Sequence, residues 1–366
     1  MPDLFIGLMS GTSVDAVDGA LVDLSGRAPV TLGFESEPIP MALRAALLDL
    51  QRPGDDELGR AALASVELTR LYGSVARRLA PAAQGAVRAI GAHGQTVRHR
   101  PELGYTLQLI DGALLAELTG ADVVCDFRSA DVAAGGQGAP LVPAFHAGVF
   151  AHPSRRRAIV NLGGIANLTL LAPGEAVRGF DSGPGNVLLD GWCESNTGER
   201  FDRDGQWAAG GRPDAQLLAA LLAEPYFARA APKSTGRDLF NMEWLGRALA
   251  RPARAQDVQA TLVELTARTI ADAARGFCAE EVFLCGGGAG NGTLVARIAA
   301  LLAPARVSTT GELGLDPQAV EAAAFAWLAS RRVAGLPGNL PAVTGARGPR
   351  LLGALYGAPW RGSGRE

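Results

Sequence analysis

The chain has 366 residues, of which 48% are hydrophobic and 19% charged, and its formal net charge is −3. This balance predicts a folded protein of about two domains and excludes a disordered chain. No stripe of Lys and Arg interleaved with aromatic residues occurs, so we expect no nucleic-acid partner. No apolar run approaches the ~20 residues needed to cross a bilayer, so we expect no membrane partner.

The four cysteines, Cys125, Cys193, Cys278 and Cys285, are widely spaced and form no C-x-x-C pair. This spacing argues against a disulfide framework and against a structural zinc site. The sequence enters an apolar strand almost at once, without the basic, apolar and small-residue regions of a secretory signal. We therefore expect a cytoplasmic protein.

The first 24 residues predict a strand, a tight turn and a second strand, with the turn formed by Gly, Ser and Thr. Such a turn brings backbone N–H groups and the hydroxyls of Thr12 and Ser13 into one small space, which suits a phosphate. Asp15 and Asp18 come just after the bend. An ordinary hairpin and a nucleotide site are both open at this point. Residues 30–37 predict a third, antiparallel strand.

Helices are predicted at residues 42–50 and 55–80, because apolar side chains recur there at near-helical spacing. Residues 86–92 predict a buried strand that runs into the polar sequence HGQTVRH. Ligands gather beyond the carboxyl ends of strands in open α/β sheets, so His93, Gln95 and Thr96 are candidate site residues on one loop. A purely structural histidine is the alternative.

A helix at 111–119 and a strand at 122–125 follow, and the strand ends in the polar residues Asp126, Arg128 and Asp131. Residues 133–143 are rich in Gly and Pro and show no period. This segment is the best candidate for a crossing between two domains.

The second half opens as the first did, with a strand at 158–161, a turn at Gly163 and Gly164, and a returning strand at 168–171. This second Gly turn lies about 150 residues after the first, which would suit a duplicated domain. A strand at 177–180 then leads to Asp181 on a Gly/Pro-rich loop. Taken alone, a turn-forming aspartate is the simpler interpretation of Asp181.

Helices at 213–223 and 258–276, with a polar loop at 231–241 between them, precede a strand at 281–285. Gly286, Gly287 and Gly288 follow that strand directly, and consecutive glycines let a flat ring or a phosphate approach the backbone. Asp316 and Pro317 predict the start of a helix that carries Glu321 among small apolar residues. That carboxylate lies either at the solvent-exposed rim of the helix face or inside the protein in a functional role, because burying an unpaired charge is costly.

Two hairpins with Gly/Ser/Thr turns, an Asp loop and a GGG turn form the order expected of an actin-like, two-domain, ATP-dependent phosphotransferase. The sequence also resembles the anhydro-N-acetylmuramic acid kinases of peptidoglycan recycling. The stretches that carry this resemblance run through nearly the whole chain: GLMSGTSVDAVD (7–18), GAHGQTVRH (91–99), DFRSADVAAGGQGAPLVP (126–143), NLGGIAN (161–167), FDSGPGN (180–186), PKSTGRDLFN (232–241), CGGGAGN (285–291) and the helix of Glu321.

The resemblance implies the α/β fold of the hexokinase, Hsp70 and actin superfamily (ASKHA, RNase H-like), with ATP and Mg²⁺ in a cleft between two domains, and it implies a homodimer. We expect the first domain at residues 1–133 plus about 345–366, and the second at 134–344. The resemblance makes Asp181 the catalytic base, with Glu321 as a second catalytic residue. Asp181 and Glu321 are also expected to bind the sugar, together with His93, Gln95, Thr96 and Arg128. Mg²⁺ is expected to bind mainly through water, with Asp15 as its protein contact. The implied ATP-binding residues are Gly11, Thr12, Ser13, Val14, Asp15, Ala16, Val17, Asp18, Gly163, Gly164, Asn167, Gly286, Gly287, Gly288 and Asn291.

The chain departs from the family pattern at two positions. Ala16 stands where the family usually has Gly, and it would be strained if the position requires a positive φ. Ser182 stands where the family usually has Thr, and it keeps the hydroxyl. Neither departure removes a charged group.

The expected reaction uses ATP to open the 1,6-anhydro ring of 1,6-anhydro-N-acetylmuramic acid with water and to phosphorylate O6. A kinase for the related anhydrosugar levoglucosan would show similar motifs at the ATP cleft. An actin-like ATPase switch would share both phosphate hairpins but would have no need of an Asp loop facing a sugar.

Overall fold

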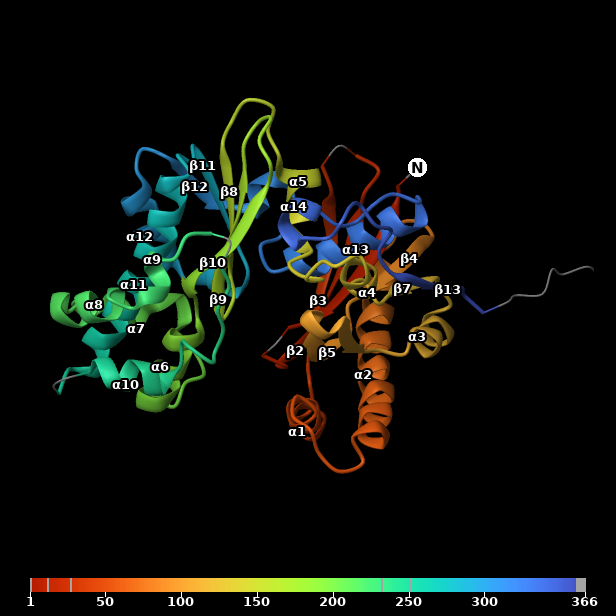
Figure 1. Cartoon of the computed structure of the whole chain (residues 1–366), viewed down its shortest axis with the longest axis horizontal. Helices are drawn as coiled ribbons and strands as arrows, with labels where there is room; N and C mark the ends of the chain where they lie inside the picture. The colour runs from red at the N-terminus through yellow and green to blue at the C-terminus, as the bar shows by residue number, and fades with distance from the viewer. Residues whose placement is uncertain (1, 12, 27, 232, 250–251, 360–366) are drawn as a thin grey trace, which may run out of the picture. The chain divides into compact units, whose positions relative to one another are not determined.

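The computed structural model describes residues 2–11, 13–26, 28–231, 233–249 and 252–359, and the chain divides into two compact α/β units. The first unit comprises Met1–Val149 and Ala319–Glu366, and the second comprises Phe150–Gln318 (Figure 1). Residues 134–149 and 319–344 therefore lie in the first unit, whereas the sequence analysis placed them in the second domain. The helix of Glu321 accounts for part of this difference, because it packs on strands of the first unit.

The first unit is built on a six-stranded sheet in the order β13-β7-β4-β1-β2-β3. Strands β1, β2 and β3 are antiparallel neighbours, β4 and β7 run parallel to β1, and β13 pairs with β7 in the antiparallel sense. The strands are β1 (Leu4–Ser10), β2 (Ala16–Asp23), β3 (Val30–Pro38), β4 (Val87–Ala92), β7 (Val123–Cys125) and β13 (Ala354–Tyr356).

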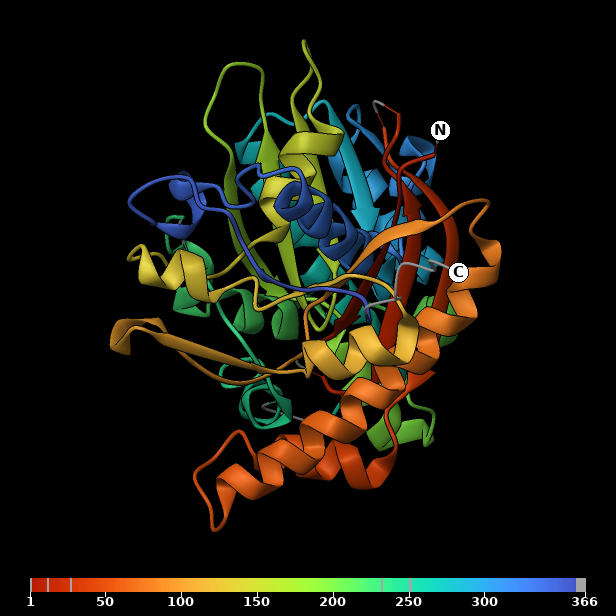
Figure 2. The ribbon, with the colours of Figure 1, turned by 90° about the vertical axis from the view of Figure 1, so that its right-hand side faces the viewer.

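Helices cover both faces of this sheet. Side chains of α2 (Glu57–Leu79), such as Tyr72 and Val75, pack with Ile6 and Leu8 in one apolar core, and α3 (Gly112–Thr119) lies beside α2 (Figures 1 and 2). The first unit also contains α1 (Met41–Asp49), α4 (Ser129–Ala133), α14 (Pro341–Thr344) and all but the last residue of α5 (Val142–Phe150).

Helix α13 (Val320–Val333) packs against β1 and β4 at two glycines. A Cβ atom at Gly7 would lie 1.8 Å from the carbonyl oxygen of Ala322, and one at Gly91 would lie 2.0 Å from that of Phe325. Only glycine allows such an approach of helix backbone to strand backbone. The two glycines therefore fix the position of the helix that carries Glu321.

The second unit is built on a five-stranded sheet in the order β10-β9-β8-β11-β12. Strands β8, β9 and β10 are antiparallel neighbours, and β11 and β12 continue the sheet in parallel with β8. In the first unit, the five strands β3-β2-β1-β4-β7 have the same order and the same directions as β10-β9-β8-β11-β12, as expected of a duplicated domain. The strands are β8 (Arg157–Leu162), β9 (Ile165–Leu171), β10 (Arg178–Pro184), β11 (Glu281–Cys285) and β12 (Arg306–Thr309).

Helices α11 (Ala255–Gly276) and α12 (Gly292–Leu302) pack side by side over this sheet, and their apolar side chains share one core with β8 and β11. The other helices are α6 (Val187–Thr197), α7 (Gln206–Ala209), α8 (Ala215–Leu222), α9 (Pro225–Ala228) and α10 (Met242–Ala248). Within the described part of the chain, no helix is both long enough and apolar enough to cross a membrane.

Several sequence predictions differ from the structure. Gln95 and Thr96 lie in strand β5 (Gln95–Arg100), which pairs with β6 (Tyr105–Leu109) in a separate hairpin, and not in a loop (Figure 2). Helix α5 occupies the end of the segment predicted to be irregular. Helix α13 begins at Val320 and not at Asp316, because the Asp316 carboxylate accepts a hydrogen bond from the N–H of Gln318 in a local turn.

Candidate active site

The turn between β1 and β2 carries the first group of predicted ATP-binding residues. Gly11 accepts a backbone hydrogen bond from Val14 at 3.1 Å, and Val14 is fully buried with a φ of 54°. A β-branched residue adopts this left-handed conformation only where its surroundings impose it, and here its side chain packs in the core of the unit. The positive φ therefore falls at Val14, while Ala16 begins β2 and is absent from the residues with positive φ.

Polar contacts also stiffen the region after this turn. Arg44 donates to the carbonyl oxygen of Ser13 at 3.3 Å and pairs with the Asp15 carboxylate at 3.3 Å. Val17 is buried in β2, and burial raises the pKa of Asp18, whose carboxylate accepts a hydrogen bond from Ser36 at 2.6 Å. Thr12, the remaining predicted residue of this stretch, lies outside the described residues.

His93 and Arg128, both predicted to bind sugar, lie in direct contact. The guanidinium of Arg128 donates to His93 Nε2 through Nε at 3.0 Å, and its Nη2 lies 2.8 Å from the same atom. His93 is buried against the ring of Phe325, and its Nδ1 has no hydrogen-bond partner in the part of the chain that the structure describes. Burial, with the positive charge of Arg128 as a second cause, holds the pKa of His93 well below its usual range. The imidazole is therefore neutral at physiological pH, and its Nδ1 is a buried polar atom left to be satisfied.

Gln95 and Thr96 extend this polar cluster along β5. Gln95 is 1% exposed, and its side-chain oxygen Oε1 has no hydrogen-bond partner among the described residues. Thr96 accepts a hydrogen bond from Gln108 of β6 at 3.1 Å. Glu321, in the first turn of α13, is close enough to Arg128 for its carboxylate to raise the pKa of that guanidinium.

In the second unit, the turn at Gly163 and Gly164 is bonded to the segment that follows Asp181. The N–H groups of Gly185 and Asn186 donate to the carbonyl oxygens of Gly164 and Gly163 at 2.9 and 2.8 Å. Asn167 of β9 pairs with Asp181 of β10 in the sheet register. The structure therefore brings the second hairpin and Asp181 together.

Asp181 lies inside β10, at an irregularity of the strand between Asp181 and Gly183, and not on a loop. Its Oδ2 accepts the backbone N–H of Thr235 at 3.0 Å, and its carbonyl oxygen accepts the hydroxyl of Tyr226 at 2.7 Å. Burial raises the pKa of Asp181, and the Thr235 N–H opposes this shift. Ser182, the family departure, donates to the carbonyl oxygen of Ala166 at 3.2 Å.

The GGG turn packs against the same hairpin. A Cβ at Gly286, whose φ is +79°, would lie 2.2 Å from Oδ1 of Asn161 at the end of β8, and a Cβ at Gly288 would lie 2.8 Å from Oδ1 of Asn186. Both positions therefore require glycine. Asn291 caps α12 by accepting the N–H of Leu294 at 3.0 Å, and Gly287 lies in the short 3₁₀ turn that connects strand and cap.

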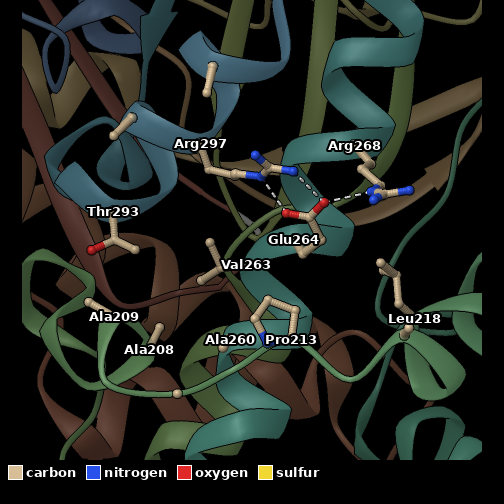
Figure 3. Close-up of a pocket in the computed structure, with 14 residues that line it drawn as sticks. Ala208, Ala209, Pro213, Leu218, Ala260, Val263, Glu264, Arg268, Thr293 and Arg297 are labelled. Carbon is tan, nitrogen blue, oxygen red and sulfur yellow. Dashed lines mark hydrogen bonds and ion pairs between the residues drawn. The ribbon is translucent and has the colours of Figure 1, made fainter.

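A pocket of about 620 Å³ opens between α11 and α12 (Figure 3). Small side chains form most of its walls, and Glu264 of α11 lies among them with its carboxylate bonded to Arg268 and to Arg297 of α12. Thr293, the second residue of α12, places one part of the pocket close to the GGG turn. The lining residues are Ala208, Ala209, Gly211, Pro213, Ala215, Leu218, Ala260, Val263, Glu264, Arg268, Thr293, Ala296, Arg297 and Ala300.

The described residues contain no group of three or more His, Cys, Asp and Glu side chains that could hold a metal ion. Asp15, the predicted metal contact, is already paired with Arg44. Mg²⁺ in kinases usually keeps several waters and binds through one or two carboxylates and the substrate phosphates. A Mg²⁺ ion bound in that form would need only one or two carboxylates beside the phosphates, and Asp15 is the one predicted here.

Sequence reasoning missed several residues of these sites. Tyr226 and Thr235, which contact Asp181, lie 45 and 54 positions from it. Thr235 lies in the stretch PKSTGRDLFN that carries the family resemblance, but no local pattern marks Tyr226. Glu264 was hidden inside a helix whose spacing only indicated an inward face. Its neighbours at i−4 and i+4, Ala260 and Arg268, give the one signal that could have been used, a charged pair on a face of small residues.

Comparison with known proteins gives a consistent result. Residues 3–358 match the model of the family described as Anhydro-N-acetylmuramic acid kinase. Proteins of that name from Bordetella avium and Bordetella petrii are 58% and 59% identical to this chain, over 97% of it and 96% of each relative. The protein of that name from Pseudomonas paraeruginosa is 54% identical, over 97% of this chain and 99% of the relative.

Solved structures give a looser match. A ROK family glucokinase from Streptomyces griseus in complex with glucose and AMPPNP is 16% identical, with a TM-score of 0.40 over 88% of this chain and 99% of the other. The activator of the 2-hydroxyisocaproyl-CoA dehydratase from Clostridium difficile, with bound ADPNP, is 12% identical, with a TM-score of 0.45 over 88% and 92%. At these scores the likeness is too loose to place a site.

Proposed function

Because the chain belongs to the anhydro-N-acetylmuramic acid kinase family, we propose that it is an ATP-dependent kinase acting on 1,6-anhydro-N-acetylmuramic acid. The reaction opens the 1,6-anhydro ring with water and phosphorylates O6. Its products are N-acetylmuramic acid 6-phosphate and ADP, as a step of peptidoglycan recycling.

The bridging oxygen of an anhydrosugar determines what the base must do. An ether oxygen has no proton to give, so the base takes a proton from water, and that water attacks C1 as the C1–O6 bond breaks. The electron pair of this bond stays on O6, which takes the γ-phosphoryl group of ATP. Asp181 is the base in this proposal.

The environment of Asp181 is the observation that carries the proposal. Its carboxylate is oriented by the Thr235 N–H, and burial raises its pKa, which makes it a stronger base than an exposed aspartate. Glu321 and Arg128 are assigned to the sugar, together with His93, Gln95 and Thr96. The orphaned polar atoms of His93 and Gln95 support that assignment.

For ATP, we assign the phosphates to the backbone of Gly11–Asp18 and of Gly163 and Gly164. Asp15, with water and the phosphates, would hold Mg²⁺, which would supply neutralisation of phosphate charge. The nucleoside is assigned to the GGG turn and Asn291, with its base in the adjoining pocket, which is large and apolar enough for a flat ring. We further propose that the enzyme works in the cytoplasm as a homodimer.

Replacing Asp181 with Asn tests this proposal. We expect turnover to fall by about 10²- to 10⁴-fold, because the amide cannot accept the proton from water. The Kd for ATP, measured by calorimetry, should change little. Asp272→Asn, an exposed aspartate on α11, is the matched control and should keep normal turnover. Near-normal turnover of the Asp181 variant would remove Asp181 from the base role.

A further inference from the structure

Asp131 is a fully buried carboxylate whose hydrogen bonds join two distant parts of the first unit. It is 0% exposed and lies in the short helix α4. Its Oδ2 accepts the backbone N–H of Gly138 at 2.8 Å. Its Oδ1 accepts the side chains of Asn339 and Thr344, each at 2.7 Å. A buried charge is tolerated only where such donors surround it.

The backbone adds further bonds between the same two segments. The N–H of Gln137 donates to the carbonyl oxygen of Thr344 at 2.7 Å, and the N–H of Arg347 donates to that of Ala134 at 3.0 Å. Residues 134–138 are thus fixed on one side by Asp131 and on the other by the segment around α14. The conformation of this loop depends on the carboxylate at its centre.

Gly138 connects this network to the candidate sugar site. Its N–H is bonded to Asp131, and its carbonyl oxygen accepts Nη1 of Arg128 at 2.8 Å. Gly138 has a φ of +65°, and a Cβ there would lie 2.7 Å from Val132, so the loop can pass close to α4 only at glycine. Both polar groups of one residue are therefore used, one by Asp131 and one by Arg128.

Arg128 in turn contacts His93 by the two nitrogens described above. Its side chain has few other positions open to it, because the acceptors on both sides are fixed in the fold. Burial lowers the pKa of Arg128 to about 10, and the carboxylates of Glu321 and Asp131 act in the opposite direction. The guanidinium is thus charged at neutral pH. Because it is buried, its charge acts on a ligand only if the side chain is oriented toward that ligand.

We propose that Asp131 is a positioning residue for sugar binding, which acts through Gly138 to orient Arg128 and, through Arg128, His93. This inference rests on the proposed function, since it takes Arg128 and His93 as contacts of the anhydrosugar. Asp131 itself does not touch the substrate. Replacing Asp131 should therefore raise the KM for the sugar and leave the KM for ATP unchanged.

The test measures kcat and the KM for both substrates in Asp131→Asn, Arg128→Ala and the double variant. Because hydrogen bonds to charged groups are the stronger ones, we expect Asp131→Asn to raise the KM for the sugar at least about tenfold, with the KM for ATP within about twofold of wild type. In the Arg128→Ala background, Asp131→Asn should add little, since contacts that act through one another are not additive.

A second pair of variants covers the case in which Asp131→Asn does not fold. Thr344→Val removes one donor to Asp131 at nearly constant shape and should raise the KM for the sugar. Thr344→Ser keeps the hydroxyl and should leave the KM for the sugar close to its wild-type value. Equal effects on the KM for both substrates, or full additivity with Arg128→Ala, would overturn the inference. Failure of the wild-type enzyme to phosphorylate the anhydrosugar would instead overturn the proposed function.

Discussion

At the scale of single residues, Asp181 is anchored at three points before any substrate binds. Thr235 bonds its carboxylate, Tyr226 bonds its carbonyl oxygen, and its own N–H donates to the carbonyl oxygen of Lys233 at 3.1 Å. Tyr226 is 1% exposed and packs edge-to-face against Phe240. A base held this firmly can act on a positioned water without first being ordered.

Tyr226→Phe removes one of these anchors and keeps the aromatic ring. We expect kcat to fall by between about 5- and 100-fold, because small displacements of a catalytic group are costly, with the KM for ATP unchanged. Tyr105→Phe, in the exposed part of the β5–β6 hairpin, is the matched control. A normal kcat in Tyr226→Phe would show that this bond does not position the base.

The pH profile separates this effect from a change in the carboxylate itself. Burial raises the pKa of Asp181 above the usual 3.8 of an aspartate, and the base acts only when deprotonated, so kcat should fall as the pH drops through that raised pKa. The Tyr226 hydroxyl bonds the carbonyl and not the carboxylate. Tyr226→Phe should therefore lower the plateau and leave the acidic limb at the same pH.

The family resemblance marked Asp181 in the sequence, where its residue type alone indicated an ordinary turn, but nothing marked its support Tyr226. An aspartate beside a Gly-rich segment is visible locally, whereas its pairing with Tyr226 and Thr235 is created only by the tertiary fold. The strain expected at Ala16 shows the same limit. Composition predicted a tight turn, but which residue takes the positive φ depends on Val14 being drawn into the core.

At the scale of elements, Glu264 joins α11 to α12 beside the pocket in Figure 3. Its side chain is 6% exposed, and it bonds Arg297 through both oxygens, at 2.5 and 2.8 Å, and Arg268 at 2.6 Å. These hydrogen bonds, first of all that to Arg297, hold the pKa of Glu264 below its usual range. The spacing of the two pocket walls depends on this cluster.

Glu264→Gln should raise the KM for ATP several-fold and reduce the preference for ATP over GTP, because a less tightly joined pair of helices fits the base less closely. The KM for the sugar should not change. Glu243→Gln, an exposed pair partner of Arg247 on α10, is the control. A change in the sugar KM with no change in the ATP KM would contradict the assignment of the base to this pocket.

Elements with a clear period were predictable and those set by distant partners were not. Helix α2 and strand β4 lie within a few residues of their predicted ranges, because α2 has a buried face at helical spacing and β4 is a short apolar run that is buried over residues 89–92. Strand β5 is polar, and only its pairing with β6 makes it a strand. Helix α5 follows a Gly/Pro-rich segment and carries no polar face, so no helical period was visible.

At the scale of the whole molecule, the repeated strand order in the two units matches the duplicated architecture that the two Gly turns predicted. The expected boundaries were less accurate, because α13 follows the second unit in sequence and packs on β1 of the first. Close approach at Gly7 and Gly91 produces that arrangement. A single glycine in each strand did not indicate from the sequence that a helix packs there.

The central claim is that water opens the anhydro ring as O6 receives the phosphoryl group. It is tested most directly by mass spectrometry of the product made from 1,6-anhydro-N-acetylmuramic acid and ATP in ¹⁸O water. Product first made in ordinary water and then kept in ¹⁸O water serves as the control for exchange. We predict one heavy oxygen at C1 and a phosphate at O6 without label. Unlabelled C1, or ADP formed without any phosphorylated sugar, would contradict the account.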